Sequence, residues 1–403
     1  MVDSRDMLPI ERLKFAFYLV IAYIYFSLLE LKRRGRNYVF PPNPRILVIP
    51  ILTRIGDMVC ATPVFRSIKE RFPEGQLSVV CGKKILDVIR KNPCINEIIN
   101  INDMRFKGFW GRGRFFFFIN QKKYDVVISL SNNPFNNLAA AFSAAPISIK
   151  TTHYPRTRAE KMSDWFNSVR IEYKDGTRIV DHYKKLLAPL GVDDFNNIKE
   201  VQRTSAGDIR AMQLIASVCA YRQGFLIGIS ISTGNSVKEW GDGKFLDLVK
   251  ALDRLQGIQR FLIIGSKSDK DRIDAFVKIA GASCVAVTDF SLEEIPSLIA
   301  SLDLFIAADT GLIHVADALN IPLIDIIGPV DPCEQAPAGP QRVIIAPDNV
   351  EPSVFAMKRQ GVISKQKKAV DATSVAAVAN AATALLGQKN MDEKTTYQYS
   401  AIL

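Results

Sequence analysis

The sequence is poor in the residues from which metal and redox centres are made. Among 403 residues there are six cysteines, each at least thirteen residues from the next, and three histidines. There is no C-x-x-C pair, so neither a zinc ribbon nor a dithiol redox motif can form locally, and three histidines argue against a multi-histidine metal site. We therefore expect neither a metal nor a cofactor. Few, dispersed cysteines are typical of a reducing, cytoplasmic setting.

Two common nucleotide-binding signatures are also missing. G-x-G-x-x-G follows neither of the apolar runs that are expected to open a sheet, Ile46–Leu52 and Phe225–Ile231. The Walker spacing G-x-x-x-x-G-K is absent from the loop after the second run. These absences argue against a nicotinamide-dependent oxidoreductase and against a P-loop enzyme.

The composition is that of a globular protein, with 48% apolar and 23% charged residues. The chain is too long for one ordinary core and predicts two domains with extensions. Its net charge of +11 is unevenly distributed, because Arg105–Lys123 contains six basic residues, seven aromatic residues and no acidic one.

The Arg105–Lys123 segment has three interpretations. Its bases, Arg105, Lys107, Arg112 and Arg114, would contact an anionic acceptor or a membrane surface. Alternatively the segment is a surface loop in which Phe115–Phe118 forms a buried strand edge. Basic and aromatic residues also suit single-stranded nucleic acid, but no nucleic-acid module accompanies them, and we expect no nucleic-acid partner.

An uncharged apolar run, Phe15–Leu29, lies near the N-terminus and is followed by a basic cluster. It is short for a membrane span, which needs about 20 apolar residues. A cleaved signal peptide would carry its bases before the run and a small-residue site after it, so cleavage is rejected. We expect interfacial attachment, with a span or a helix packed on the globular body as alternatives. A span would leave the downstream domains in the cytoplasm, and Asn37–Arg45 reads as a proline-rich linker.

Beyond this linker, short β-branched runs alternate with helical stretches, which predicts two doubly wound, Rossmann-like α/β domains. We place the N-terminal helix and linker at 1–43, the first domain at 44–205, the second at 206–345, and a C-terminal helix and tail at 346–403. The expected strands are Ile46–Leu52, Leu77–Cys81, Ile98–Ile101, Val126–Leu130, Phe225–Ile231, Phe261–Ile264, Cys284–Val287, Leu304–Ala307 and Pro322–Ile327.

The expected helices include one starting at Thr62–Pro63, with the hydroxyl as cap and the proline in the first turn. Others cover Lys244–Leu255, Asp269–Ala280, Leu292–Ala300 and Ala372–Leu386, before a loose tail at Gln388–Leu403.

Three loops after strands carry residues suited to chemistry. In Thr53–Asp57, the Asp57 carboxylate would accept a proton from a substrate hydroxyl, or would cap the next helix. Ser232–Trp240 combines hydroxyls, a glycine and Lys238, which suits a phosphate, although a solvated polar loop is the plain alternative. In Ala308–His314, a helix start with Gly311 predicts an anion site, or else a capped helix with a packed histidine.

The blocks RIGDMVCATPVFRSIKERFP and AADTGLIHVADALNIPLIDIIGPVDP resemble the signature blocks of glycosyltransferase family 9, the lipopolysaccharide heptosyltransferases. STGNSVKEW and HYKKLLAPLGV fit the same pattern, and the resemblance covers roughly residues 44–332. It implies a GT-B fold of two Rossmann-like domains facing a cleft, with the acceptor on the first and the nucleotide sugar on the second. Transfer would be inverting and metal-independent.

The resemblance implies roles for single residues. Asp57 corresponds to the general base, Lys238 to the lysine that neutralises the leaving diphosphate, and Thr233 to a neighbouring donor. The segment around the diphosphate and the sugar comprises Asp309, Thr310, Gly311 and His314. Asp269 stands where a glutamate for the nucleotide ribose is common.

Two other positions depart from the family. Ser129 replaces a common aspartate, and Gly241 replaces a usual proline. The leading expectation is an inverting heptosyltransferase of lipopolysaccharide-core or related cell-surface glycan assembly. It would use ADP-heptose and an anionic glycolipid or oligosaccharide acceptor at the cytoplasmic face of the inner membrane. The alternatives are the same fold with a donor such as a UDP-N-acetylhexosamine, and a non-catalytic sugar-nucleotide-binding protein.

Overall fold

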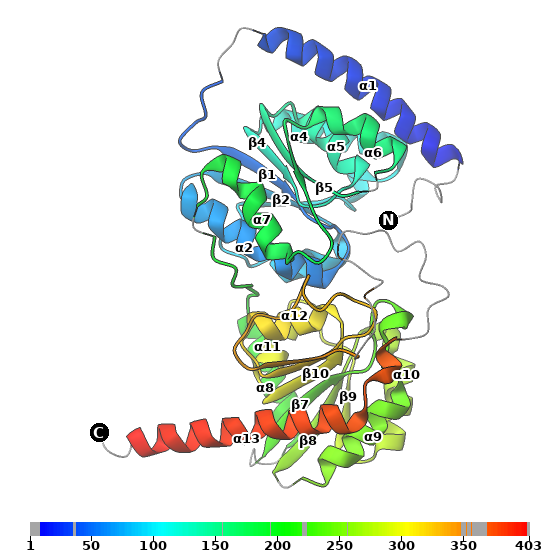
Figure 1. Ribbon diagram of the computed structural model, residues 1–403, viewed down its shortest axis with the longest axis vertical. Helices are drawn as coiled ribbons and strands as arrows, with labels where there is room; N and C mark the ends of the chain where they lie inside the picture. Colours follow the sequence, from blue (N-terminus) through cyan, green and yellow to red (C-terminus); the bar gives the residue numbers. More distant parts are fainter. Residues whose placement is uncertain are drawn as a thin grey trace. The chain divides into compact units, whose positions relative to one another are not determined.

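The computed structural model describes residues 9–34, 38–154, 156–193, 195–219, 224–255, 257–347, 352, 356 and 369–400. The chain divides into two compact units. Unit 1 comprises Met1–Asn197 with Phe355–Gly361, and unit 2 comprises Ile198–Val354 with Val362–Leu403. Each unit contains its own six-stranded sheet (Figure 1).

The sheet of unit 1 is wholly parallel and has the order β3-β2-β1-β4-β5-β6. This is the strand order of a doubly wound fold, in which the chain starts in the middle of the sheet and adds strands first on one side and then on the other. The strands are β1 (Arg45–Ile49), β2 (Gln76–Cys81), β3 (Glu97–Asn100), β4 (Val126–Ser129), β5 (Ile147–Thr152) and β6 (Val169–Glu172). The helices are α1 (Pro9–Arg33), α2 (Ile55–Arg71), α3 (Leu86–Ile89), α4 (Gly108–Gln121), α5 (Pro134–Ser143), α6 (Arg158–Ser163) and α7 (Ile179–Leu187).

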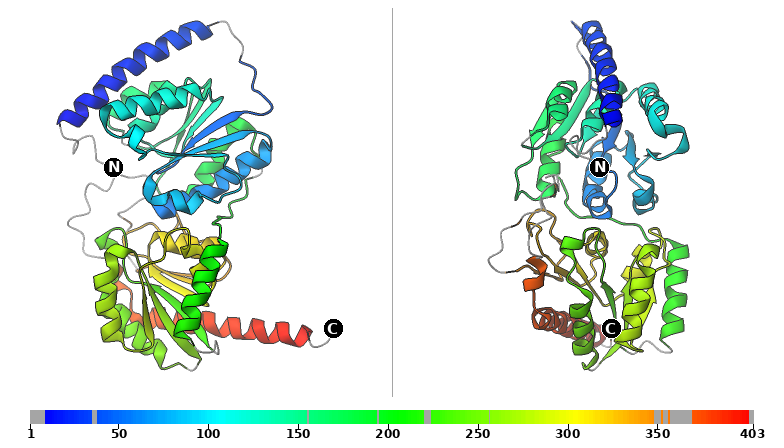
Figure 2. Two further views of the ribbon diagram at one scale, coloured as in Figure 1. Left: turned by 180° about the vertical axis from the view of Figure 1, so that it is seen from behind. Right: turned by 90° about the vertical axis from the view of Figure 1, so that its right-hand side faces the viewer.

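Helices cover both faces of this sheet (Figures 1 and 2). Helices α4 and α5 pack on one face in a core rich in phenylalanine, and α1 lies against these two helices as an outer layer. Helices α2 and α7 pack together on the other face. Because both faces are covered, the central strands are continuous apolar runs, as a parallel sheet requires.

Unit 2 repeats the same topology. Its parallel sheet has the order β12-β11-β10-β7-β8-β9, which is the order of unit 1 when its strands are counted from β7. Helices α9, α10 and α13 cover one face, and α8, α11 and α12 cover the other. The strands are β7 (Phe225–Ser230), β8 (Ile258–Ile264), β9 (Cys284–Val287), β10 (Leu304–Ala308), β11 (Leu323–Ile326) and β12 (Arg342–Ile345). The helices are α8 (Ser205–Val218), α9 (Asp242–Asp253), α10 (Lys270–Ala280), α11 (Ile295–Ala300), α12 (Gly311–Ala318) and α13 (Val375–Ser400).

Each sheet has one topological switch point, where the connections that follow two neighbouring strands lead to opposite sides of the sheet. It lies between β1 and β4 in unit 1 and between β7 and β10 in unit 2. Ligands of open α/β sheets bind beside the carboxyl ends of the strands at this point. The three loops singled out in the sequence follow β1, β7 and β10, and therefore all lie at switch points.

The predicted strands are confirmed within a few residues, but three local predictions are wrong. Thr62 and Pro63 do not start a helix, because α2 already begins at Ile55. Pro63 has no N–H for the Val59 carbonyl one turn earlier, and the Thr62 hydroxyl donates to that carbonyl instead, at 2.7 Å. The proline is therefore accommodated inside the helix.

The second and third errors concern helices. Phe115–Phe118 is part of helix α4, not a loop or a strand edge, and it buries Phe115 and Phe116 while Phe117 stays exposed. The expected loose tail is helical as far as Ser400, since α13 continues through it. The start of the predicted linker, at Asn37, and the last three residues lie outside the described residues.

A buried histidine makes the stability of unit 1 dependent on pH. His182 lies on α7 with its Nε2 2.9 Å from the Thr151 hydroxyl, and burial lowers its pKa to about 4. The unfolded chain takes up this proton near pH 6.5 and the folded chain only near pH 4, so the free energy of unfolding should fall by about 3 kcal/mol between these values on acidification. Urea unfolding measured across this range should show a flatter pH profile for His182→Asn. An unchanged profile would contradict the prediction.

Candidate active site

Asp57 lies where the central strand of unit 1 passes into a helix. Strand β1 ends at Ile49, and Asp57 occupies the first turn of α2, whose N-terminal cap is Arg54. Asp57 is therefore the third helical residue and not the N-cap itself. A helix N-terminus stabilises a negatively charged side chain, so this site favours an ionised carboxylate.

Asp57 is buried beside an arginine and a tyrosine. Only 4% of the residue is exposed, and its Oδ2 lies 3.5 Å from an Arg54 nitrogen. Tyr183 of α7 is buried nearby, and burial raises its pKa well above the ordinary value, with the Asp57 charge adding to the shift. A recessed carboxylate beside a half-exposed arginine can accept a proton from a hydroxyl brought to the end of β1.

Ser129, where the family commonly has an aspartate, ends β4 on the other side of the switch point. It is buried, and its hydroxyl donates to the Ser131 carbonyl and accepts from the Asn136 amide, at 2.9 and 2.8 Å. The serine thus belongs to a neutral hydrogen-bond network that holds the loop after β4.

The sequence did not reveal a buried ion-pair cluster at the neighbouring strand. Lys150 of β5 is fully buried, and its Nζ lies 2.6 Å from Asp164, which Arg156 also contacts at 2.6 Å. Burial lowers the pKa of Lys150, and the Asp164 carboxylate opposes the shift. The cluster ties the segment after β5 to the sheet.

Removing the carboxylate of this cluster should destabilise unit 1. Asp164→Leu leaves the Lys150 ammonium buried without its anion, which costs about 3–5 kcal/mol of unfolding free energy. The double variant Lys150→Met/Asp164→Leu should recover most of this loss in urea unfolding. Asp247→Leu, which breaks an exposed pair with Lys250, is the control and should cost less than about 1 kcal/mol. Equal losses in the single and double variants would contradict this account.

In unit 2 an ion pair joins the two switch-point loops. Lys238, in the loop after β7, places its Nζ 2.6 Å from Oδ2 of Asp309, directly after β10, and both side chains are mostly buried. The Thr233 hydroxyl donates to the Asn235 carbonyl at 2.6 Å and shapes the same loop. The structure therefore brings Thr233, Lys238 and Asp309 to one edge of the sheet.

Helix α12 begins beside this ion pair. Thr310 is its extended N-terminal cap and makes no side-chain cap bond, and Gly311 is the first helical residue. The first N–H groups of a helix have no partner within it, so this end offers amide donors and a positive partial charge. Together with the Lys238 ammonium, it is suited to a diphosphate.

His314 lies one turn into α12 and contacts Lys199, a buried cation that the sequence did not reveal. Its Nδ1 lies 3.2 Å from Nζ of Lys199, which also lies 2.8 Å from Asp317 Oδ2. Burial lowers the pKa of His314 well below its usual value, with Lys199 and Lys238 adding to the shift. The imidazole is therefore neutral, with Nδ1 accepting from Lys199 and the ring proton on Nε2.

A second buried acid lies under the same loops. Asp325 of β11 stands beside Ala307 in the sheet register, and burial raises its pKa well above the usual range, with the Asp309 charge adding to the shift. Burial therefore favours the protonated form of the Asp325 carboxyl. Asp309 is the aspartate that pairs with Lys238, at 2.6 Å.

Asp269 follows β8, the strand beside β7. Its Oδ2 accepts from the Ser266 amide at 3.0 Å in a capping box, which shapes the turn at that strand end. Ribose contact by this carboxylate stays a prediction.

Gly241, where the family usually has proline, has a φ of +99°. Proline is restricted to a φ near −65° and cannot adopt this conformation. A proline at this position would therefore require another backbone path after the buried Trp240.

The four bases predicted to contact an acceptor or a membrane differ in their surroundings. Arg112 donates to the Ile101 carbonyl and lies over the Phe135 ring, and Arg105 pairs with Asp103. Arg105, Lys107 and Arg114 are exposed, and Arg112 is half-buried. Only part of this set is therefore directed outwards.

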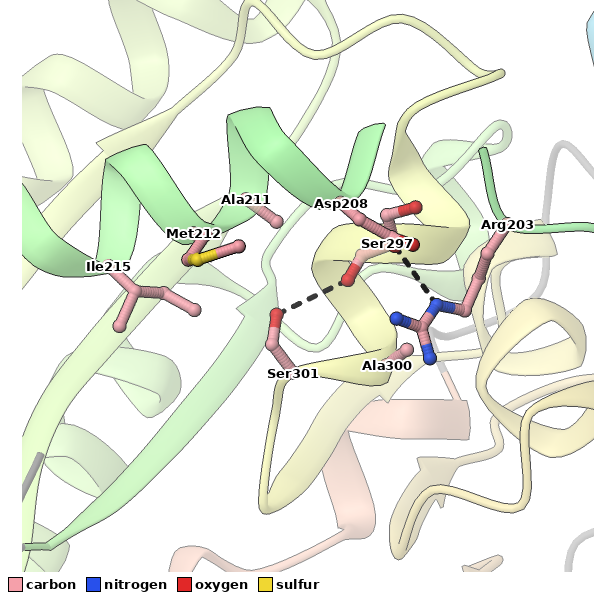
Figure 3. A pocket seen from close by; sticks show the side chains of 8 residues that line it. All are labelled: Arg203, Asp208, Ala211, Met212, Ile215, Ser297, Ala300 and Ser301. Carbon is pink, nitrogen blue, oxygen red and sulfur yellow. Dashed lines mark hydrogen bonds and ion pairs between the residues drawn. The ribbon is translucent and has the colours of Figure 1, made fainter. Parts of the chain in front are cut away.

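A cavity of about 340 Å³ lies between helices α8 and α11 of unit 2 (Figure 3). None of the predicted site residues lines it. Arg203 donates to Asp208 at 3.0 Å, and the Ser301 hydroxyl donates to the Ser297 carbonyl at 3.2 Å. The lining residues are Arg203, Asp208, Ala211, Met212, Ile215, Ser297, Ala300 and Ser301.

Two doubly wound units, each with polar residues at its switch point, define an α/β protein of the GT-B-like class. Residues 112–360 match the model of glycosyltransferase family 9 (heptosyltransferase). The chain belongs to this family. Asp57 lies outside the matched range.

Curated relatives and solved structures agree with this assignment. The chain is 25% identical over 285 residues to lipopolysaccharide heptosyltransferase 3 of Escherichia coli, covering 68% of this chain and 81% of that one. It is 25% identical over 303 residues to lipopolysaccharide heptosyltransferase 2 of Salmonella typhimurium, covering 69% of this chain and 81% of that one. A family 9 glycosyl transferase from Veillonella parvula shares the fold with a TM-score of 0.74 at 23% identity. The match covers 87% of this chain and 100% of that one. E. coli ADP-heptose lps heptosyltransferase II shares the fold with a TM-score of 0.67 at 20% identity. The match covers 86% of this chain and 99% of that one.

Proposed function

We propose that this glycosyltransferase moves a heptose from ADP-heptose onto a lipopolysaccharide-core or related cell-surface glycan, with inversion and without a metal ion. The observation that carries the proposal is the 2.6 Å Lys238–Asp309 pair, which joins the loops after β7 and β10 beside the start of α12. Phosphate oxygens placed there would meet an ammonium and helix amides at once. We assign acceptor binding to residues 44–205 and nucleotide-sugar binding to 206–345.

The proposed reaction is a single displacement. The Asp57 carboxylate takes the proton of an acceptor hydroxyl, and the hydroxyl oxygen forms a bond to the anomeric carbon of the sugar. The bond from that carbon to the diphosphate oxygen breaks, and the nucleoside diphosphate leaves with the electron pair. Inversion follows from one displacement, which needs a base on the acceptor side and charge stabilisation on the leaving side.

The remaining site residues have supporting roles in this scheme. Lys238 would neutralise the leaving diphosphate, and Thr310 and Gly311 would offer amide donors. His314, whose neutral ring carries its proton on Nε2, would donate a hydrogen bond without adding charge. Thr233 would complete the loop, and Asp269 would contact the nucleotide ribose.

The names of relatives support the choice of donor and acceptor. One solved structure is of an ADP-heptose lps heptosyltransferase, and another is of E. coli heptosyltransferase WaaC with ADP. The curated relatives are heptosyltransferases of lipopolysaccharide or lipooligosaccharide. The proposed partners are therefore ADP-heptose and an anionic glycolipid or oligosaccharide acceptor. The proposed location is the cytoplasmic face of the inner membrane, with peripheral or monotopic attachment.

The donor is tested by ligand-induced stabilisation followed by product analysis. A ligand that binds only the folded state raises the unfolding midpoint, so ADP should raise it more than UDP at equal concentration. Incubation with a panel of nucleotide sugars and a core oligosaccharide should then yield a product heavier by one heptose residue. Stabilisation by UDP alone, with transfer of an N-acetylhexosamine, would replace the proposed donor. Nucleotide binding without any transfer would indicate a non-catalytic binding protein.

A further inference from the structure

Helix α1 has two apolar faces, and unit 1 covers only one of them. On the inner face Tyr18, Leu19 and Ala22 are buried against α4 and α5. The Tyr18 hydroxyl donates to the Phe109 carbonyl at 2.6 Å, and Asn120 of α4 donates to the Tyr25 hydroxyl at 2.6 Å. This face is therefore docked on the folded domain by packing and by hydrogen bonds.

The docking extends along the helix. Near the middle of α1 the Tyr23 ring stacks on Trp165, and its hydroxyl donates to the Met162 carbonyl. At the C-terminal end, Arg33 donates to the Ala144 carbonyl. Contacts from Tyr18 to Arg33 hold α1 against the rest of unit 1, and Figures 1 and 2 show the helix running along one side of that unit.

The opposite face of α1 is an exposed apolar stripe. Its members recur every three or four residues, which places them on one side of a helix. Each is between 38% and 71% exposed, although large apolar side chains on a soluble surface are normally scattered singly. The stripe consists of Leu13, Phe17, Val20, Ile21, Ile24, Leu28 and Leu31.

Aromatic and basic side chains of α4 continue this surface. Phe17 of the stripe contacts Phe109, and Phe109 contacts Trp110, with ring centroids 5.2 and 5.1 Å apart. Trp110 is 74% exposed, which suits a ring at the level of lipid headgroups. The Arg105–Lys123 segment, which includes α4, carries six basic residues and no acidic one, so the neighbouring charge is positive.

We infer that the α1 stripe with Trp110 is a docking surface for an anionic lipid bilayer, in which α1 lies in the plane of the interface and does not span the membrane. Although α1 is the one helix among the described residues long and apolar enough to cross a bilayer, a span would require it to leave unit 1 and expose its inner face. Lying flat, it buries the outer stripe in the headgroup and acyl boundary and keeps basic residues near anionic lipid. The inference rests on the membrane attachment in the proposed function and specifies its geometry.

Vesicle binding tests the surface. The full chain should sediment with mixed phosphatidylcholine and phosphatidylglycerol vesicles, and less with phosphatidylcholine alone. The triple variant Val20→Asp/Ile24→Asp/Leu28→Asp should bind at least about 100-fold more weakly, because each lost apolar contact is worth about tenfold. The matched control changes the equally exposed Ile209, Met212 and Ile279 of unit 2 to aspartate and should bind normally. Unchanged thermal unfolding shows that each variant is folded.

Cysteine labelling separates lying flat from spanning. In a Cys333→Ser background, Lys14→Cys and Lys32→Cys place a thiol near either end of α1. Both should react with a membrane-impermeant maleimide in inverted inner-membrane vesicles, and neither in intact spheroplasts. Labelling of the two positions from opposite sides would overturn the in-plane geometry.

The remaining outcomes are also decisive. If the triple variant keeps its vesicle binding but loses self-association, the stripe is an interface between copies of the chain and the inference is wrong. Transfer to a soluble core oligosaccharide should be unchanged in the triple variant. Absence of transfer in the wild type with intact vesicle binding would refute the proposed function and leave the docking surface standing.

Discussion

Replacing Asp57 by asparagine is expected to lower kcat by about 10²–10⁴-fold, because the amide keeps the shape of the side chain but cannot take the acceptor proton. The affinity for ADP should stay near that of the wild type, since Asp57 belongs to unit 1 and the loops proposed to bind the diphosphate belong to unit 2. Steady-state kinetics with a core oligosaccharide would give kcat, and titration calorimetry would give the ADP affinity. This split between turnover and binding is the signature of a base that acts only in the reaction.

The chain offers a matched control for this substitution. Asp87 also lies in the first turn of a helix that follows a strand of the same sheet, and Asp87→Asn should leave kcat within about twofold. If Asp57→Asn retains full turnover, Asp57 has no part in proton transfer. If it loses ADP affinity as strongly as turnover, the substitution has disturbed the fold and not the chemistry.

The second large effect is expected at Lys238. Lys238→Gln removes the cation that faces the developing negative charge of the leaving diphosphate, and should lower kcat/KM by about 10²–10³-fold. It also leaves Asp309 without the partner at 2.6 Å, so a carboxylate would repel the phosphates. Lys238→Arg should recover part of the activity by keeping the charge. The exposed Lys250 provides the control, because Lys250→Gln should leave kcat/KM unchanged.

A double-variant cycle separates the two roles of this lysine. If Lys238 only neutralises Asp309, then Lys238→Gln/Asp309→Asn should restore activity, because the repulsion disappears with the carboxylate. If the ammonium contacts the diphosphate, the double variant should remain at least about 10²-fold below the wild type. Complete recovery would remove Lys238 from the proposed reaction.

In both units the polar loops of the candidate site could be predicted from the sequence, but their buried charged partners could not. The loops after β1, β7 and β10 were recognisable because each follows an apolar run and carries polar residues within a few positions. The buried partners Lys199, Lys150 and Asp164 were not, since no local pattern distinguishes a buried lysine from a solvated one. Lys199 meets Asp317 from 118 residues away. The boundary between the units, after Asn197, places it with unit 2.

For the apolar run Phe15–Leu29 and the aromatic run Phe115–Phe118 too, the sequence showed the composition, and only the structure showed the packing. The apolar run Phe15–Leu29 left interfacial attachment, a span and packing on the globular body open, and only the structure shows that one side of α1 packs against α4 and α5. The Phe115–Phe118 run suited a strand edge by composition, and became helical because α4 packs two of its rings into the core of unit 1. Four adjacent apolar residues have no period, so only the neighbours they pack against decide between helix and strand.

The sequence by itself therefore determined the α/β class, most strands and the polar loops at their ends, because these depend on short-range patterns of apolar and polar residues. Tertiary structure alone decided the strand order and, with it, which loops share a switch point. It also decided which charges pair beneath those loops and which face of α1 remains exposed. These features arise from contacts between segments far apart in the chain, and the local sequence around a residue does not identify its distant partner.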